Sequence, residues 1–164
     1  MKTNSALKVM ALGLSMAFST AALAQTSASD LVGTWSMTSN VNISKDGKKV
    51  DVFGPNVKGM GIFSSDGRFA VVNTNPDTPK FAANNRAQGT AEENQAAVRG
   101  SIALFGTYTV VDKVVHMKVE GSTYPNWSGT EQKRNVISTS ADEMRWTFAA
   151  SIGGGAEIIW KRIK

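Results

Sequence analysis

The chain has 164 residues, with 18 Lys and Arg against 13 Asp and Glu, one His and no Cys. This length corresponds to one domain, because single domains usually contain roughly 100–200 residues. The lack of Cys excludes disulfide scaffolds, thiol nucleophiles and Cys-ligated metal centres, and one His excludes a multi-histidine site. An apolar content of 41% and a charged content of 19% predict a packed globular protein. We therefore expect no metal site and no cofactor.

Residues 1–24 have the composition of a secretory signal peptide. Its features are a positively charged start with Lys2 and Lys8, the short apolar run Val9–Phe18, and the small-x-small pattern Ala22-Leu23-Ala24. The run is too short to cross a bilayer, which takes about 20 apolar residues. No later segment has the composition of a membrane span. We expect cleavage before Gln25, a mature domain over 25–164, and a periplasmic or secreted protein; a buried N-terminal helix is the alternative.

The charge pattern does not favour a nucleic-acid partner. Loss of Lys2 and Lys8 lowers the formal net charge from +5 to +3. The remaining cations are spread along the chain, often next to acids, as in Glu131-Gln132-Lys133-Arg134. Nucleic-acid surfaces typically combine a basic stripe with aromatic residues, and this sequence contains no such stripe. We expect no binding to DNA or RNA.

Most of the mature chain alternates apolar and polar residues with a period of two, which predicts strands. In chain order these are Leu31–Thr38, Met60–Ile62, Phe69–Val71, Leu104–Val110, Val115–Glu120, Glu131–Val136, Glu143–Phe148 and Glu157–Lys161, with a further short strand near Lys48–Val52. About eight strands joined mainly by hairpins predict an all-β, antiparallel up-and-down barrel. Such a barrel holds core side chains or one small ligand. A β-sandwich is the alternative architecture.

One segment breaks the strand pattern. Thr90-Ala91-Glu92-Glu93 is a capping box, and it predicts one short helix over Ala91–Arg99 that ends at Gly100. The helix follows a long irregular stretch, Asn73–Gly89. Long loops in compact domains are usually functional or mobile. We expect either a lid over the barrel mouth or a plug that seals the bottom of the barrel.

Gly33-Thr34-Trp35 opens the first mature strand, and this Gly-x-Trp resembles the lipocalin signature. In that superfamily the Trp lies at the closed end of the barrel, and an Arg from a late strand packs over the indole as a cation–π contact. The resemblance implies a structural role for Gly33 and Trp35. Arg162 and Arg134 are both candidates for the Arg.

Several further motifs occur in a characteristic order. They are Phe53-Gly54-Pro55-Asn56-Val57-Lys58-Gly59, Ser65-Asp66-Gly67-Arg68, Pro79-Lys80-Phe81, Phe105-Gly106-Thr107-Tyr108-Thr109-Val110, His116 with Glu120-Gly121-Ser122, and Pro125-Asn126-Trp127-Ser128-Gly129 leading to Arg134. Together they resemble the bacterial and fungal lipocalin-like domain family over about Asp30–Arg162. The family pattern often has Pro where this chain has Val57. Most members have no assigned activity, so the resemblance implies the fold more than the function.

Six residues form the expected ligand site. They are Tyr108, His116, Tyr124, Asn126, Trp127 and Arg134. Arg134 can hold a ligand carboxylate with two hydrogen bonds, and Tyr108 can donate to a carbonyl or alkoxide. In the alternative interpretation, Asn126 shapes a turn and Trp127 caps the core. We expect the apolar lining to come from four Trp and four Met side chains, namely Trp35, Trp127, Trp146, Trp160, Met37, Met60, Met117 and Met144.

The sequence of its strand leaves open whether the His116 side chain faces the cavity or the solvent. His116 shares a face with Lys118 and Glu120, whereas the opposite face is apolar and would normally point inward. That places His116 in solvent. The resembled family keeps a His here, with a Glu four residues later. If the barrel forms an oligomer through an apolar outer face, His116 would line the cavity instead.

These observations favour an exported lipocalin-like protein that binds a small apolar or amphipathic molecule in its barrel. No Gly-x-Ser-x-Gly motif, phosphate-binding loop or glycosidase-like carboxylate pair is present in the sequence. One alternative is a cofactor-free isomerase or cyclase that uses His116 or Tyr108 as acid or base. Another is a packed structural or stress-related envelope protein. The volume of the cavity and the direction of His116 discriminate among the three.

Overall fold

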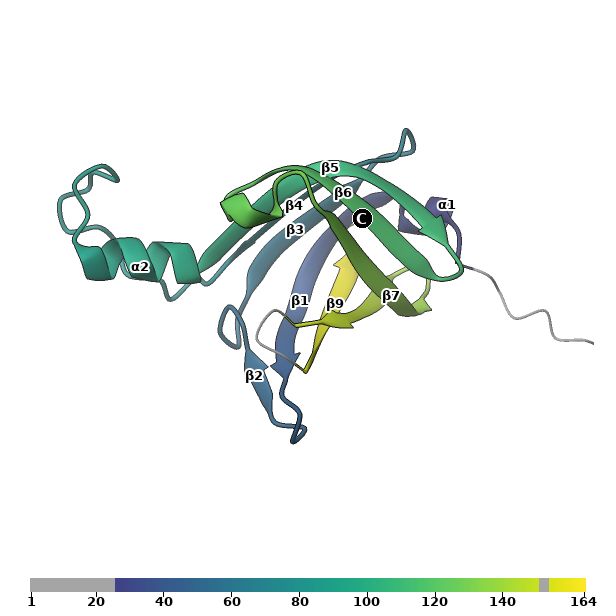
Figure 1. Cartoon of the computed structure of the whole chain (residues 1–164), viewed down its shortest axis with the longest axis horizontal. Coiled ribbons are helices and arrows are strands. Elements are labelled where there is room, and N and C mark those ends of the chain that lie inside the picture. Colours follow the sequence, from purple (N-terminus) through teal and green to yellow (C-terminus); the bar gives the residue numbers. More distant parts are fainter. Residues whose placement is uncertain (1–25, 151–153) are drawn as a thin grey trace, which may run out of the picture.

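The computed structural model describes residues 26–150 and 154–164, and it shows one closed antiparallel β-barrel (Figure 1). The elements are α1 (Ala28–Leu31), β1 (Gly33–Ile43), β2 (Lys49–Asp51), β3 (Lys58–Phe63), β4 (Arg68–Thr74), α2 (Ala91–Arg99), β5 (Ser101–Val111), β6 (Val114–Ser122), the 3-10 turn η1 (Pro125–Trp127), β7 (Glu131–Thr139), β8 (Glu143–Ala149) and β9 (Gly155–Arg162). The expected signal peptide, residues 1–24, and its cleavage site lie outside the described residues.

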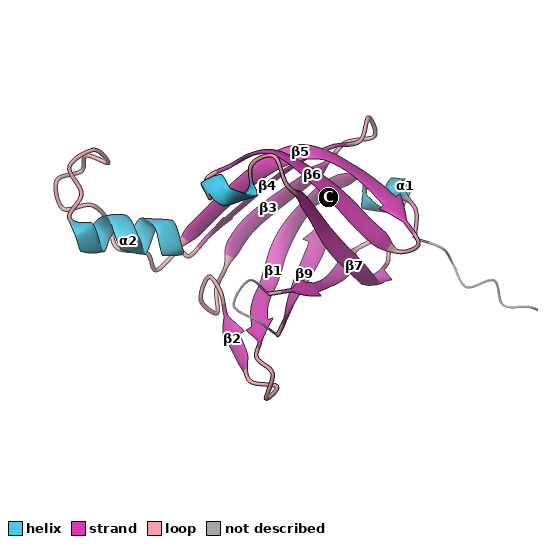
Figure 2. Cartoon of the chain, in the orientation of Figure 1, coloured by secondary structure: helices cyan, strands magenta, loops and turns pink. Residues whose placement is uncertain are grey.

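The strands pair in the order β2-β1-β3-β4-β5-β6-β7-β8-β9, and β1 also pairs with β9. This second pairing closes eight strands into a barrel and leaves β2 as a short extra strand on the edge of β1. The predicted all-β, eight-stranded barrel is confirmed, and the closed sheet excludes the β-sandwich. The helices α1 and α2 lie at opposite ends of the barrel (Figure 2).

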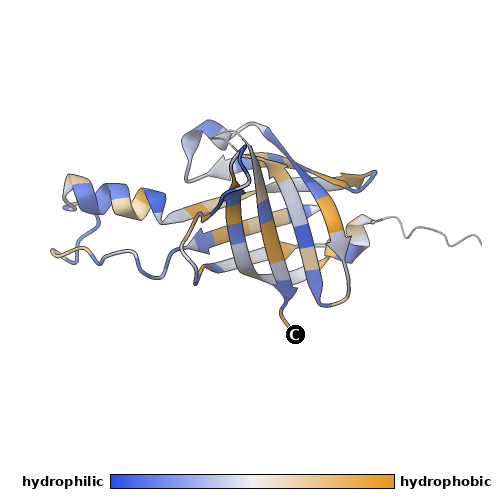
Figure 3. Ribbon diagram, turned by 90° about the horizontal axis from the view of Figure 1, so that it is seen from below, coloured by the Kyte–Doolittle hydropathy of each residue, from blue (hydrophilic) through white to orange (hydrophobic). Residues whose placement is uncertain are grey.

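The alternation of residues along the strands builds the core. In β4 every second residue is buried, namely Phe69, Val71 and Asn73, and the residues between them are exposed. Figure 3 shows the same alternation of polar and apolar residues across the barrel wall. The largest fully buried side chains include Trp35, Trp146 and Trp160, which occupy the barrel interior.

Strand β3 differs from the expected pattern, because Met60 and Ile62 face outward and are 42% and 45% exposed. The inward positions of β3 belong to Gly59, Gly61 and Phe63. A Cβ atom at Gly61 would lie 3.1 Å from the Trp160 indole. The two glycines therefore leave room for larger side chains from neighbouring strands, and Met60 contributes nothing to the barrel lining.

The closed end of the barrel is built around Trp35. Its indole N–H donates to the carbonyl of Leu31 over 2.8 Å, which fixes α1 across the barrel end. The alternation predicts that the first strand begins at Leu31. In the structure Leu31 is instead the last residue of α1, and β1 begins at Gly33. The guanidinium of Arg162 covers the Trp35 ring and donates to the carbonyls of Val32 and Asp30. The sequence left Arg134 and Arg162 as alternatives, and the structure assigns this contact to Arg162.

Helix α2 has the bounds that the capping box predicts. The Thr90 hydroxyl accepts from the Glu93 N–H at 3.2 Å, and the Glu93 carboxylate accepts from the Thr90 N–H at 2.8 Å. The helix and the preceding loop project away from the barrel (Figure 1), and none of the helix residues is buried. The helix and this loop therefore form neither a lid over the barrel mouth nor a plug in the barrel. Only Val98 and Arg99, in the last turn of α2, reach the mouth of the cavity.

Within residues 26–150 and 154–164, no helix has the length and apolar character needed to cross a membrane.

Candidate functional site

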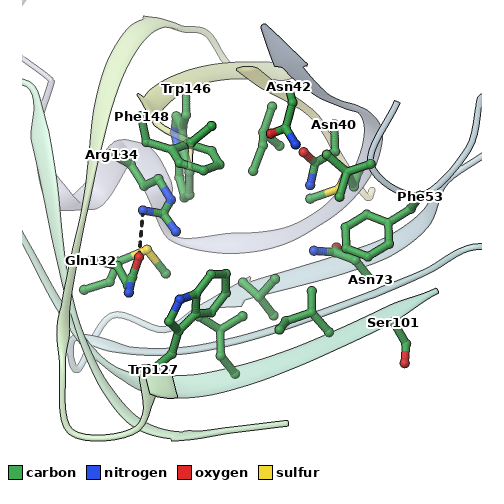
Figure 4. Close-up of a pocket in the computed structure, with 18 of the residues that line it drawn as sticks. Asn40, Asn42, Phe53, Asn73, Ser101, Trp127, Gln132, Arg134, Trp146 and Phe148 are labelled. Carbon is green, nitrogen blue, oxygen red and sulfur yellow. Dashed lines mark hydrogen bonds between the residues drawn. The ribbon is translucent and has the colours of Figure 1, made fainter. Parts of the chain in front are cut away.

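The barrel encloses a cavity of about 430 Å³ at the end opposite α1 (Figure 4). Its apolar lining includes Met37, Phe53, Val71, Ile102, Leu104, Met117, Trp127, Trp146, Phe148, Ile158 and Trp160. Its polar lining consists of Asn40, Asn42, Asn73, Arg99, Ser101, Gln132 and Arg134. Among the described residues that line the cavity there is no Asp or Glu, whereas two are Arg. An apolar hollow with a few polar groups is the usual form of a small-molecule site.

Arg134 is the charged residue inside this cavity. It lies on the inward face of β7 and is only 7% exposed. Its guanidinium carbon is 4.1 Å from the centroid of the Phe148 ring on β8, and it donates to the Lys133 carbonyl at 2.9 Å and to Gln132 at 3.5 Å. No carboxylate of the described chain forms an ion pair with it. The guanidinium therefore retains donors for another acceptor.

Burial lowers the pKa of Arg134 to about 10, because the low-dielectric interior disfavours the charged form. At neutral pH the side chain still carries its proton and its positive charge. A buried cation without an anionic partner is an unfavourable arrangement for stability. An acidic group on a bound molecule would supply the missing partner and form charge-assisted hydrogen bonds.

A second polar group lies on the opposite wall, formed by Asn40 and Asn42 of β1 and Asn73 of β4. Strands β1 and β4 are each three strands away from β7 around the eight-stranded barrel, so they face Arg134 across the interior. Figure 4 shows these amides on the side of the cavity away from Arg134. Asn73 is 4% exposed, and its side-chain oxygen has no hydrogen-bond partner in the described part of the chain.

Two indole groups also line the cavity with unused donors. The Nε1 atoms of Trp146 and Trp160 are buried and have no hydrogen-bond partner among the described residues. The two rings are neighbours, with centroids 5.9 Å apart. Buried indole N–H groups usually have a partner, so these two donors are unsatisfied within the described structure.

The structure brings two of the six predicted ligand residues, Trp127 and Arg134, into the cavity. Tyr124 packs edge-on against Trp127, with ring centroids 5.6 Å apart, but it is 45% exposed and does not line the cavity. Asn126 lies in η1 and is exposed. The turn around η1 thus places Trp127 at the cavity and leaves the other two residues outside it.

Tyr108 points into the barrel but lies near its closed end. Its hydroxyl donates to the Ser64 carbonyl at 3.0 Å, and its ring packs edge-on against Phe63. Burial and, secondarily, the nearby Asp66 charge raise the pKa of Tyr108. Tyr108 does not line the cavity, and its hydroxyl is already engaged.

His116 lies on the outer face of β6, on the strand side opposite the buried Val115 and Met117. Its Nδ1 is 3.0 Å from the Glu131 carboxylate of β7, and this hydrogen bond holds the pKa of Glu131 below its usual range. His116 is therefore not among the cavity residues. No group of three or more Asp, Glu or His side chains in the described part of the chain is placed to hold a metal ion.

The sequence analysis missed the three Asn residues of the opposite wall. A polar residue at an inward position of a strand is a signal that could have found Asn73, because it continues the apolar set of Phe69 and Val71. Asn40 and Asn42 lacked such a signal. A register shift between Met37 and Ser39 turns the strand, and this irregularity brings both amides to the inside.

The fold and the cavity define a lipocalin-like barrel. The lipocalin-like domain family matches residues 32–163, and the chain therefore belongs to that family. This assignment confirms the resemblance that the sequence motifs indicated.

Relatives and solved structures are also similar to parts of the chain. The 4'-hydroxy-3'-methoxypropiophenone carrier protein of Aspergillus oryzae is 40% identical over an alignment of 70 residues, which covers 37% of this chain and 62% of the fungal protein. A lipocalin-like protein from Bacteroides uniformis, known from a crystal structure, is 17% identical with a TM-score of 0.47, over 82% of this chain and 99% of that one. A de novo designed fluorescence-activating β-barrel is 15% identical with a TM-score of 0.42, over 83% and 96% of the two chains.

Proposed function

We propose that this protein is a carrier that binds a small amphipathic molecule with an acidic group in the barrel cavity. The observation that carries this proposal is Arg134, a buried cation that faces an apolar cavity and has no acidic partner among the described residues. A carboxylate or phenolate on an apolar body has the matching chemistry, because the apolar part fills the cavity and the anion reaches the guanidinium.

The surroundings of the cavity support an anionic ligand. Arg99 lies at the mouth and Arg134 lies inside, and none of the described lining residues is acidic. A site lined by charge of one sign attracts ligands of the opposite sign and raises their rate of entry. The similarity to a fungal protein named as a carrier of a small aromatic ketone supports a role in carrying a small molecule, without indicating an acidic group on it.

The alternatives from the sequence find less support. A fully packed structural barrel does not agree with a cavity of about 430 Å³. The isomerase or cyclase alternative depended on His116 or Tyr108 as acid or base, and neither residue lines the cavity. We therefore do not propose a catalytic role for either residue.

Binding is tested by intrinsic tryptophan fluorescence, because three cavity residues, Trp127, Trp146 and Trp160, report on occupancy. Decanoate and decanol share an apolar chain and differ in the charged head. The proposal predicts saturable fluorescence changes with decanoate at micromolar concentrations and weaker binding of decanol, by about one to two decades. No response to either molecule would contradict the proposal.

Export of the mature chain is a separate part of the proposal, and its support is the signal-like sequence of residues 1–24. Intact-mass measurement of the protein from the periplasm or the medium is expected to show a chain that begins at Gln25. A folded cytoplasmic product that begins at Met1 would contradict this part without affecting ligand binding.

A further inference from the structure

The cavity contains two polar regions that face each other across an apolar centre. One region is Arg134 on β7, and the other is the amide cluster of Asn40, Asn42 and Asn73, on β1 and β4 (Figure 4). The rest of the lining is mostly apolar and includes Met37, Val71, Leu104, Met117 and Ile158. A ligand with one polar end would satisfy only one of these regions.

The amide cluster contains a buried group without a partner. Asn73 is 4% exposed, Asn40 is 8% exposed, and the side-chain oxygen of Asn73 accepts no hydrogen bond from the described residues. Leaving a buried acceptor unsatisfied is unfavourable, and most buried polar atoms have a partner. The neighbouring strand β3 makes room for this amide, because Gly59 is the residue paired with Asn73, and a Cβ atom there would collide with Asn73 and Met37.

We infer that the ligand is bifunctional, with an acidic group at one end of an apolar body and a neutral hydroxyl or carbonyl group at the other. This inference rests on the proposed function, since it adds a second contact to the same cavity. The acid lies at Arg134, and the neutral group exchanges hydrogen bonds with the amides of Asn73 and Asn40. A primary amide both donates and accepts, so it suits a hydroxyl group better than it suits a second charge.

The inference is tested by comparing decanoate with ω-hydroxydecanoate, together with a shorter and a longer pair of the same design. In a purely apolar cavity the added hydroxyl weakens binding, because it loses its hydrogen bonds to water. With a partner amide in place, the hydroxy acid of the best-fitting length is expected to bind at least as tightly as its parent acid.

The decisive variant is Asn73→Leu, which preserves the approximate size of the side chain and removes the amide. It is expected to weaken binding of the hydroxy acid about tenfold relative to the binding of decanoate by the same variant. Asn40→Leu is the second variant, and it serves if Asn73→Leu does not fold. Asn135→Leu is the control, because Asn135 is exposed on β7 and does not line the cavity.

The possible results separate the two proposals. If decanoate binds but the hydroxyl group weakens binding equally in the wild type and in both Asn variants, at every length, the bifunctional ligand is wrong and the carrier function stands. If neither acid binds to the wild type, both proposals fail. The inference is supported if the Asn variants lose affinity for the hydroxy acid relative to decanoate while the Asn135→Leu control binds both acids as the wild type does.

Discussion

Arg162 lies over the face of Trp35, with 4.1 Å between the guanidinium carbon and the ring centroid. The two residues are partners across the β1–β9 seam, where the sheet closes on itself. Arg162 also donates to backbone carbonyls of Val32, Asp30 and Ala141, so one side chain ties the start of β1 to the end of β9. The closure of the barrel therefore depends on a small set of contacts that mutation can test.

Trp35 is fully buried, and its removal should leave a large cavity at the closed end. Trp35→Ala is expected to lower the free energy of unfolding by about 3–5 kcal/mol, as for other buried aromatic residues. Equilibrium unfolding in urea measures this change. A loss below about 1 kcal/mol would show that Trp35 does not hold the barrel end together.

Arg162→Met tests the guanidinium separately from the side-chain stem. The variant loses the cation–π contact and the hydrogen bonds to backbone carbonyls, and we expect a loss of about 2–4 kcal/mol in urea unfolding. Arg145→Met is the matched control, because Arg145 is 39% exposed and makes only a 3.7 Å ion pair with Glu157. The control should lose less than about 1 kcal/mol. Equal losses in both variants would contradict a special role for Arg162.

The backbone conformation and the close surroundings of residue 33 explain why the Gly-x-Trp motif begins with glycine. Its φ is +136°, and a Cβ atom at this position would collide with the guanidinium of Arg162. Gly47 has a φ of +83° in a turn with open space around it. Gly33→Ala is therefore expected to destabilise the protein more than Gly47→Ala, by about 1–3 kcal/mol in thermal or urea unfolding. The reverse order would show that no close approach exists at Gly33.

Local signals predicted some elements well. The bounds of α2 follow from Thr90, Glu93 and Gly100, because capping depends on residues that are close in sequence. The barrel itself follows from alternation along the strands. The choice between Arg134 and Arg162 could not be made this way, since both occupy inward positions of their strands. Pairing of β9 with β1 decides it, and that pairing is a long-range property.

The amide side of the cavity was harder to predict for a physical reason. Polar residues on strands usually face solvent, and the register shift in β1 that turns Asn40 and Asn42 inward is visible only in the paired sheet. Likewise Met60 looked like lining, because its neighbours Gly59 and Gly61 have no side chains that would indicate which face is buried. Hydropathy alone therefore cannot locate the polar end of a mostly apolar cavity.

Arg134 should serve binding at the expense of stability. Because burial lowers its pKa to about 10, charging this group disfavours the folded state. This penalty is complete at neutral pH and declines as the pH rises through about 10, where the folded protein releases the proton before the unfolded chain does. Contacts with Phe148 and Lys133 offset part of it. Arg134→Met is expected to unfold at the same or a higher urea concentration than the wild type at neutral pH. A loss above about 3 kcal/mol would assign Arg134 to the fold instead.

Binding of decanoate and decanol to the wild type and to Arg134→Met, measured by isothermal titration calorimetry, tests the role of Arg134 most directly. The wild type should prefer decanoate by about one to two decades in affinity, and this preference should disappear in Arg134→Met, which still binds decanol. An unchanged preference for decanoate in Arg134→Met would contradict the conclusion that this buried cation recognises the acidic end of the ligand.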